Sequence, residues 1–205
     1  MELKPDVILA SSKFDPAVVE RLSKIAVTIP YSHVSTNWSS NLVLLGELSG
    51  KQDKAAELVA KYNSDLATAK ESISSKLKDK KVVLIRIREG GLFVYAPKVY
   101  FNPMLYEDLG LTIPAEVQAA KAQDEIALEK LAEMNPDVLL VQFSEDENKD
   151  KPKALKELQS NPIFQSINAA KNNQVLVNIV DPLAQGGTAY SKIEFLHAFH
   201  SKLNP

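Results

Sequence analysis

The sequence predicts an α/β protein of two lobes joined by one long helix. Short apolar runs typical of buried strands alternate with helical patterns in the first fifty residues, and the same alternation returns near residue 80. Between these parts, apolar residues recur at spacings of three and four, as they do on one face of a helix. We therefore assign 1–50 to an N-terminal lobe, 51–78 to a connecting helix and 79–205 to a C-terminal α/β lobe.

The first lobe is predicted to contain two buried parallel strands, each followed by a helix. Continuous apolar runs indicate the strands, and capping residues mark the helix ends. In chain order we expect a strand at 7–10, a helix capped by Asp15, a strand at 26–29 stopped by Pro30, and a helix from Thr36 or Asn37 to Gly50.

The connecting helix has the longest periodic pattern in the chain. Its apolar stripe consists of Leu58, Tyr62, Leu66, Ala69, Ile73 and Leu77. A helix over 53–77 either forms a spine between two lobes or is one half of a helical hairpin, and the pattern leaves both open.

The C-terminal lobe is predicted to alternate strands and helices around a buried sheet. We expect strands at 81–88, 92–96, 138–141 and 175–179, helices at 102–110, 126–134 and 153–158, and a last helix with Tyr190, Ile193, Leu196 and Leu203 on its apolar face. Glycine pairs at 90–91 and 186–187 mark turns, and 145–151 reads as a charged loop.

An internal echo links the two lobes. The segment 3–9, LKPDVIL, parallels 134–140, MNPDVLL, but a helix precedes only the second copy. We infer a pseudo-repeated protein whose N-terminal lobe is incomplete. A helix followed by Pro-Asp and a strand is also a common α/β connection, and this explanation carries about equal weight.

Composition excludes several classes of function. The chain has 24 basic and 26 acidic residues, so it offers no overall basic field for nucleic acid. Without cysteine, thiol catalysis, disulfide frameworks and Cys-ligated metal sites are excluded. No phosphate-binding glycine loop, nucleophile elbow or His-Glu-x-x-His motif occurs. His197 and His200 lie three apart on one predicted helix but lack a third ligand, so we assign no metal.

A pair of arginines is the best candidate for binding chemistry. Arg86 and Arg88 share one face of a strand, near the carboxyl end where open α/β sheets bind ligands. Paired guanidiniums suit an anion with several delocalised oxygens. The structural alternative is a strand end with Arg–Glu pairs, for which Glu89 and Glu107 are the candidates.

Aromatic residues follow the arginines closely. Tyr95 and Tyr100 are candidates for the wall of a small-molecule pocket, although many aromatics of this kind are core. Trp38, the single tryptophan, either lines a cleft or packs at a helix start.

These residues and their order resemble the iron–siderophore-binding lipoproteins of Gram-positive ABC importers, nearest the Bacillus catecholate-siderophore (bacillibactin) binding type. The matching runs are RIREGGLFVY at 86–95, YFNP at 100–103, LYEDLG at 105–110, DPLAQGGTAY at 181–190, and LKPD at 3–6. The resemblance covers essentially the whole chain. It implies a non-enzymatic substrate-binding-protein fold with ligand held between two lobes joined by a long helix.

The resemblance also implies residue roles. Arg86 and Arg88 match the pair that faces the siderophore, Lys13 falls where a ligand-facing lysine stands, and Glu129 matches the glutamate that docks onto the permease. The predicted ligand-binding set consists of Lys13, Trp38, Arg86, Arg88, Tyr95, Tyr100 and Gln185. No cofactor is implied, because iron is carried within the siderophore.

The family's proteins begin with a signal peptide and a lipidated cysteine and act outside the cytoplasm, anchored to the membrane. We therefore expect this chain to be an N-terminally truncated form, with one docking glutamate and one basic ligand contact upstream of Met1. The incomplete lobe is expected to be mobile or to associate with another copy.

Two further functions stay open from the residues. One is an α/β enzyme that uses Arg86 and Arg88 to clamp an anionic small molecule. The other is a haem or cobalamin binder of the same fold, with Tyr95 or Tyr100 in its cleft.

Overall fold

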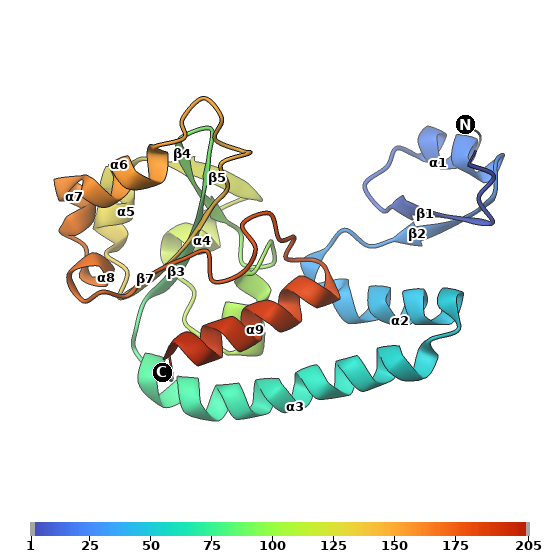
Figure 1. Ribbon diagram of the computed structural model, residues 1–205, viewed down its shortest axis with the longest axis horizontal. Helices are drawn as coiled ribbons and strands as arrows, with labels where there is room; N and C mark the ends of the chain where they lie inside the picture. The colour runs from blue at the N-terminus through green and yellow to red at the C-terminus, as the bar shows by residue number, and fades with distance from the viewer. Residues whose placement is uncertain (1–2, 204–205) are drawn as a thin grey trace.

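A computed structural model describes residues 3–203, which form two sheets connected in the chain by two successive α-helices (Figure 1). The N-terminal part contains β1 (Val7–Ser11), α1 (Pro16–Ser23), β2 (Val27–Tyr31), the short 3-10 turn η1 (Ser35–Asn37) and α2 (Trp38–Ser49). The helix α3 (Gln52–Leu77) then leads to the second sheet. The order of strands and helices confirms the predicted α/β class with its long helix.

The first sheet consists of β1 and β2 alone, paired in parallel from Val7 opposite Val27 to Ser11 opposite Tyr31. Asp15 caps α1 as predicted, since its carboxylate accepts a hydrogen bond of 2.8 Å from the Ala17 amide. The prediction that Pro30 ends the second strand was wrong. Among the described residues β2 is an edge strand, where a residue without an amide proton is tolerated.

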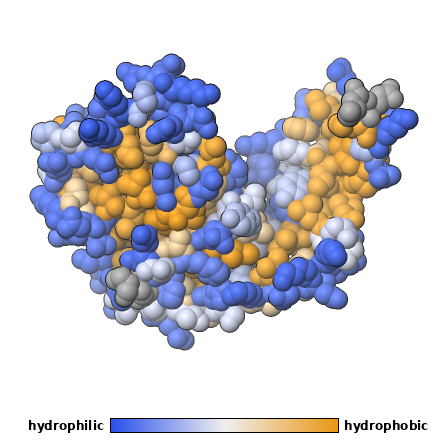
Figure 2. Space-filling model, viewed as in Figure 1, coloured by the Kyte–Doolittle hydropathy of each residue, from blue (hydrophilic) through white to orange (hydrophobic). Residues whose placement is uncertain are grey.

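These two strands are also less buried than their apolar sequences predicted. Val7 and Leu9 are about one-third exposed, at 36% and 37%, and Val27 is 67% exposed. In β1 and β2 only Ala10 is fully buried. The reason is that the described chain provides no second layer for the outer face of this sheet, which appears as an apolar area in Figure 2.

The predicted stripe of α3 is its buried face. Tyr62, Ala69, Ile73 and Leu77 are buried, and Leu58 and Leu66 are partly buried. The first half of α3 forms a hairpin with α2, and its surface also packs against the last helix, α9 (Ala189–Leu203). Both interpretations of α3 therefore hold: it is half of a hairpin and also the link to the second sheet. The residue boundaries proposed for the lobes stay predictions.

The second sheet has the strand order β5-β4-β3-β6-β7. Its strands are β3 (Val82–Arg88), β4 (Gly91–Tyr95), β5 (Gln123–Ile126), β6 (Val138–Phe143) and β7 (Val175–Val177). The strands β3, β6 and β7 are parallel, whereas β4 and β5 extend the sheet in antiparallel fashion. Every residue of β6 is buried, as is every residue of β3 except Arg88, which is the pattern of a sheet covered on both faces.

Helices around this sheet complete the core. They are the π-helical turn η2 (Met104–Asp108), α4 (Ala115–Ala119), α5 (Leu128–Met134), α6 (Ala154–Ser160), α7 (Pro162–Gln165), α8 (Asn168–Lys171) and α9. Figure 1 shows α5 to α8 gathered beside the sheet and α9 lying along α3. Stacked rings of Phe101 and Phe195, with centroids 4.3 Å apart, join α9 to the loop before η2.

Two predictions in this lobe need correction. Ile126 belongs to β5, opposite Leu92, and not to a helix, because the polar alternation before it pairs as an edge strand. Tyr190 is 74% exposed rather than part of the apolar face of α9. It shares the solvent face of that helix with Glu194 and His197, while Phe195, Leu196 and Phe199 face the core. No described helix combines the length and apolarity that a membrane crossing requires.

Candidate functional site

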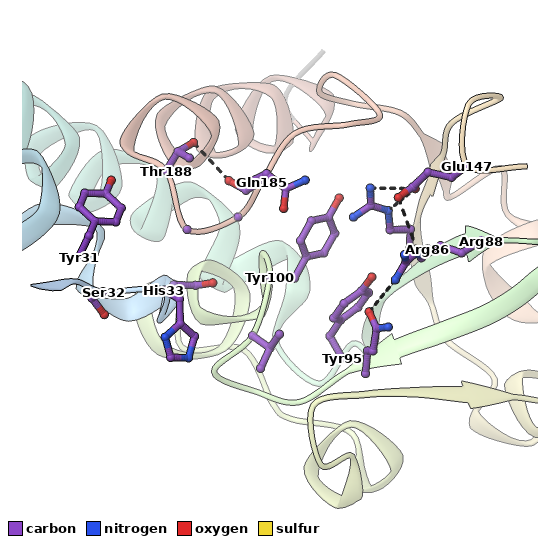
Figure 3. A pocket seen from close by; sticks show the side chains of 15 residues that line it. Tyr31, Ser32, His33, Arg86, Arg88, Tyr95, Tyr100, Glu147, Gln185 and Thr188 are labelled. Carbon is purple, nitrogen blue, oxygen red and sulfur yellow. Dashed lines mark hydrogen bonds and ion pairs between the residues drawn. The ribbon is translucent and has the colours of Figure 1, made fainter. Parts of the chain in front are cut away.

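A cavity of about 430 Å³ lies between the segment that follows β2 and the carboxyl end of β3 (Figure 3). Three parts of the chain line it. The first is the end of β2 with the segment after it, and the second is the loop before α9. The third is the second sheet, through β3, β4, the start of β5 and the loops after β4 and β6. The lining residues are Tyr31, Ser32, His33, Ser35, Arg86, Arg88, Tyr95, Val99, Tyr100, Gln123, Glu147, Gln185, Gly186, Gly187 and Thr188. The cavity therefore collects residues that are far apart in the sequence.

Arg86 and Arg88 extend into this cavity from the carboxyl end of β3. Because successive side chains alternate across a strand, residues two apart point to the same side. The Arg86 side chain is 7% exposed and the Arg88 side chain is 35% exposed. The buried guanidinium of Arg86 and the more open one of Arg88 therefore place two cations in the wall of one cavity.

Both arginines contact the same carboxylate, Glu147. Arg86 donates to Glu147 Oε2 from Nε and lies equally close through Nη2, at 2.8 Å each. The Arg88 Nε lies 3.6 Å from Glu147 Oε1, and Arg88 Nη1 donates to Gln123 Oε1 at 3.1 Å. The structural alternative of Arg–Glu pairs at the strand end is therefore confirmed, but the partner is Glu147 and not Glu89 or Glu107. The ion pair of Glu107 is with Lys98, at 4.0 Å.

Two tyrosines form the wall behind Arg86. The rings of Tyr95 and Tyr100 have centroids 4.8 Å apart, and the Arg86 guanidinium carbon lies 5.2 Å from the Tyr100 centroid. Burial raises the pKa of Tyr100 to about 12 and also raises that of Tyr95. Both phenols therefore stay protonated at neutral pH and offer O–H donors. Tyr100 also has a left-handed backbone, with φ of 59°.

The loop before α9, which forms another wall of the cavity, is fixed by close backbone packing. A Cβ atom on Gly186 would lie 2.2 Å from the carbonyl oxygen of Tyr100, so this position accepts only glycine without a shift of the backbone. Before it, the Asp181 carboxylate accepts from the Leu183 amide at 2.7 Å. After it, Thr188 Oγ1 accepts from the Ser191 amide at 3.2 Å and so supports the start of α9.

The structure brings five predicted ligand residues together and leaves two outside. Arg86, Arg88, Tyr95, Tyr100 and Gln185 all line the cavity. Lys13 is exposed on the loop after β1 and Trp38 is only 6% exposed, and neither belongs to the lining.

Trp38 takes part in a buried cluster instead. Its ring meets that of Tyr62 edge to face, with centroids 4.7 Å apart, and Lys192 Nζ lies 5.6 Å above it. Lys192 in turn pairs with Asp108 at 2.7 Å, and the Tyr62 hydroxyl donates to the same carboxylate. Of the two readings of Trp38, the structure shows packing at a helix start.

Sequence reasoning missed several lining residues. Glu147 lies in the predicted charged loop, but the sequence pattern does not predict its contact with the arginines of β3. Gln123 was not considered because β5 itself was missed. A signal did exist: the seven residues at 144–150 are all polar or charged and directly follow a buried strand, at the sheet edge where ligands bind.

Among residues 3–203, no three His, Cys, Asp or Glu side chains gather as a metal site would require. His197 instead contacts Asp65 at 2.7 Å, and His200 contacts Ser72 at 2.8 Å. Hydrogen bonds from Lys61 and His197 lower the pKa of Asp65. These contacts fasten α9 to α3.

An α/β architecture with a long linking helix, and an arginine-lined cavity at the sheet edge that faces a second part of the chain, are typical of solute-binding proteins. Residues 1–178 match the family model described as periplasmic binding protein, and the chain belongs to that family.

Individual relatives agree with this assignment. The chain is 55% identical over 203 residues to the iron-uptake system-binding protein of Bacillus subtilis strain 168, covering 99% of this chain and 64% of that relative's length. It superposes with a TM-score of 0.89 on the triscatecholate siderophore-binding protein FeuA of Bacillus subtilis, solved with ferri-bacillibactin, at 55% identity and covering 98% of this chain and 71% of that one.

A more distant structure has the same fold. Staphylococcus aureus SirA, solved with staphyloferrin B, superposes with a TM-score of 0.79 at 27% identity, covering 98% of this chain and 72% of SirA. The relatives named here are binding proteins.

Proposed function

We propose that this protein binds a ferric siderophore in the cavity beside Arg86 and Arg88 and delivers it to an ABC permease for iron uptake. The observation that carries the proposal is the position of the arginine pair. Both guanidiniums, one of them almost fully buried, line a cavity in a chain 55% identical to a protein solved with ferri-bacillibactin.

The chemistry of the cavity suits such a ligand. A ferric tris-catecholate carries roughly three negative charges, and burying it requires cations inside the site. Arg86 and Arg88 provide them, while Tyr95 and Tyr100 provide flat apolar walls with O–H groups at their ends. Iron is already fully ligated by siderophore oxygens, so the protein needs no metal ligand of its own and no further cofactor.

Intrinsic fluorescence tests the proposal, because Trp38 is the single tryptophan of the chain. Ferric tris-catecholate, citrate-hydroxamate and carboxylate siderophores are titrated into the protein, with gallium complexes as controls for quenching by iron itself. We expect saturable quenching with at least one ferric siderophore and competition by its gallium complex. Linear, non-saturating quenching with all of them would contradict the proposal.

Delivery implies a docking surface, and we assign Glu129 to it. Glu129 is exposed in the first turn of α5, where its charge also favours the helix dipole. The Glu129→Ala variant should bind siderophore as the wild type does and support slower uptake in cells. Uptake by the Glu129→Ala variant at the wild-type rate would refute this role.

The family also supports a location outside the cytoplasm, and we propose that the protein acts there as a membrane-anchored lipoprotein. Globomycin, which blocks lipoprotein maturation, should shift the protein in cells to its unprocessed form. If the protein from treated cells migrates on a denaturing gel as the untreated protein does, it is not lipidated.

We propose that the sheet of β1 and β2 associates with a second copy of the chain. Both outer strand edges are unpaired in the described part of the chain, and Val7, Leu9 and Val27 are exposed beside them. Sedimentation equilibrium should show a concentration-dependent dimer, and Val27→Lys should weaken it. A monomer at all concentrations would exclude this association.

A further inference from the structure

The carboxylate of Glu147, which contacts both arginines, lies in a loop that buried hydrogen bonds hold in place (Figure 3). The next residue, Asn148, is 1% exposed and anchors the loop: its side-chain amide donates to the carbonyls of Ile87 at 2.9 Å and Ser144 at 2.7 Å. Its Oδ1 accepts from the Gly90 amide at 3.0 Å. The Glu89 amide donates to the Glu147 carbonyl at 3.1 Å. Glu147 is thus held against the end of β3 by buried hydrogen bonds.

This position changes the charge of the cavity. Among the described residues that line it, Arg86, Arg88 and Glu147 carry the formal charges, with His33 counted as neutral. Two positive charges and one negative charge leave a net charge of +1. Without Glu147 the site would have a net charge of +2.

We propose that Glu147 is a specificity-determining residue that sets how steeply affinity depends on the negative charge of the ligand. A fixed carboxylate repels each ligand in proportion to the ligand's own charge. It therefore weakens binding of a trianion most, of a monoanion less, and of a neutral complex hardly at all. Glu147 therefore lowers the affinity for highly charged chelates and allows less charged chelates to compete for the site. The inference rests on the proposed function only in naming the ligand as a ferric chelate.

The Glu147→Gln variant tests this inference, since it removes the charge while keeping an oxygen that accepts from Arg86. We expect a gain in affinity of about threefold per unit of ligand charge, hence about thirtyfold for a ferric tris-catecholate and no change for a neutral ferric tris-hydroxamate. Raising the salt concentration should shrink the gain.

A second measurement needs no siderophore. The 15N–1H signals of the Arg86 and Arg88 Nε groups are followed while citrate, a trianion, or acetate, a monoanion, is added. In Glu147→Gln the half-saturation concentration should fall about thirtyfold for citrate and about threefold for acetate. An equal change for both anions, or no change for either, would overturn the inference.

Matched variants separate charge from structure. Glu145→Gln removes the same charge from an exposed position in the same loop and should leave all affinities near those of the wild type. Glu147→Asp keeps the charge and should keep the wild-type ratio of citrate to acetate affinity. An Asp variant that behaves like Gln would overturn the inference in favour of a loss of packing.

The two measurements distinguish this inference from the proposed function. Failure of every siderophore to bind, with the citrate and acetate result as expected, would refute the proposed function and leave the role of Glu147 standing. Tight siderophore binding with a gain independent of ligand charge would do the reverse.

Discussion

The two sheets of this protein contain the same parallel pairing but differ in what covers them. All of β6 and nearly all of β3 are buried, whereas β2 has no fully buried residue and β1 has one. The difference does not come from apolar sequence, since VILAS and VTIPY are as apolar as many core strands. It comes from the layers around each sheet. A strand sequence therefore predicts a strand well and its burial poorly.

Hydrogen exchange should show the largest consequence of this difference. Amides of β3 and β6 are covered on both faces and open only with global unfolding, whereas β1 and β2 can open locally. We expect protection factors of the two sheets to differ by more than ~100-fold in a monomeric sample. Equal protection in such a sample would show that the two regions unfold as one unit.

Substitutions of apolar residues should have the next largest effect, and they should lower the free energy of unfolding far more in the second sheet region than in the first sheet. Phe195 is fully buried and stacks on Phe101, so Phe195→Ala should lower the free energy of unfolding by about 3–5 kcal/mol. Val27 is 67% exposed in the single chain, so Val27→Ala should change it by less than about 0.5 kcal/mol in a monomeric sample. Urea titrations of the two variants measure both values. A large effect of Val27→Ala would mean that the N-terminal sheet is covered in solution.

The ion pair between Lys192 and Asp108 tests how firmly the regions are joined. Lys192 is 4% exposed on its side chain and lies against Trp38 at the start of α2. Lys192→Ala leaves the Asp108 carboxylate partly buried without its cation, which should cost about 2–3 kcal/mol of stability. A shift in Trp38 fluorescence should accompany the loss. Exchange in β1 and β2 should rise in parallel if α2 transmits the change.

Ligand affinity should show the smallest difference. Arg88→Ala removes a charge-assisted contact and should weaken siderophore binding by about 1–3 kcal/mol, with little effect on thermal melting. Lys13→Ala should have a smaller effect, because Lys13 lies outside the cavity lining. Calorimetric titration compares the two variants. A larger loss of siderophore affinity with Lys13→Ala than with Arg88→Ala would assign the main binding role to the loop after β1.

The candidate site was predictable where local pattern was enough. Period-two alternation in β3 put Arg86 and Arg88 on one side, and position at the strand end put them at the ligand edge. Their shared carboxylate was not predictable, because Glu147 is 59 residues from Arg88 and reaches it only through the pairing of β3 with β6. Trp38 was equally ambiguous, since its partners Tyr62 and Lys192 come from two other helices.

The sequence by itself determined the elements, the long helix and the arginine pair, because each depends on residues within a few turns or one strand. Only the tertiary structure decided that a carboxylate neutralises half of the arginine charge, that Trp38 is core, and that the first sheet lies half uncovered. These properties depend on contacts between segments far apart in the chain. Periodicity and capping carry no information about which distant surfaces will meet.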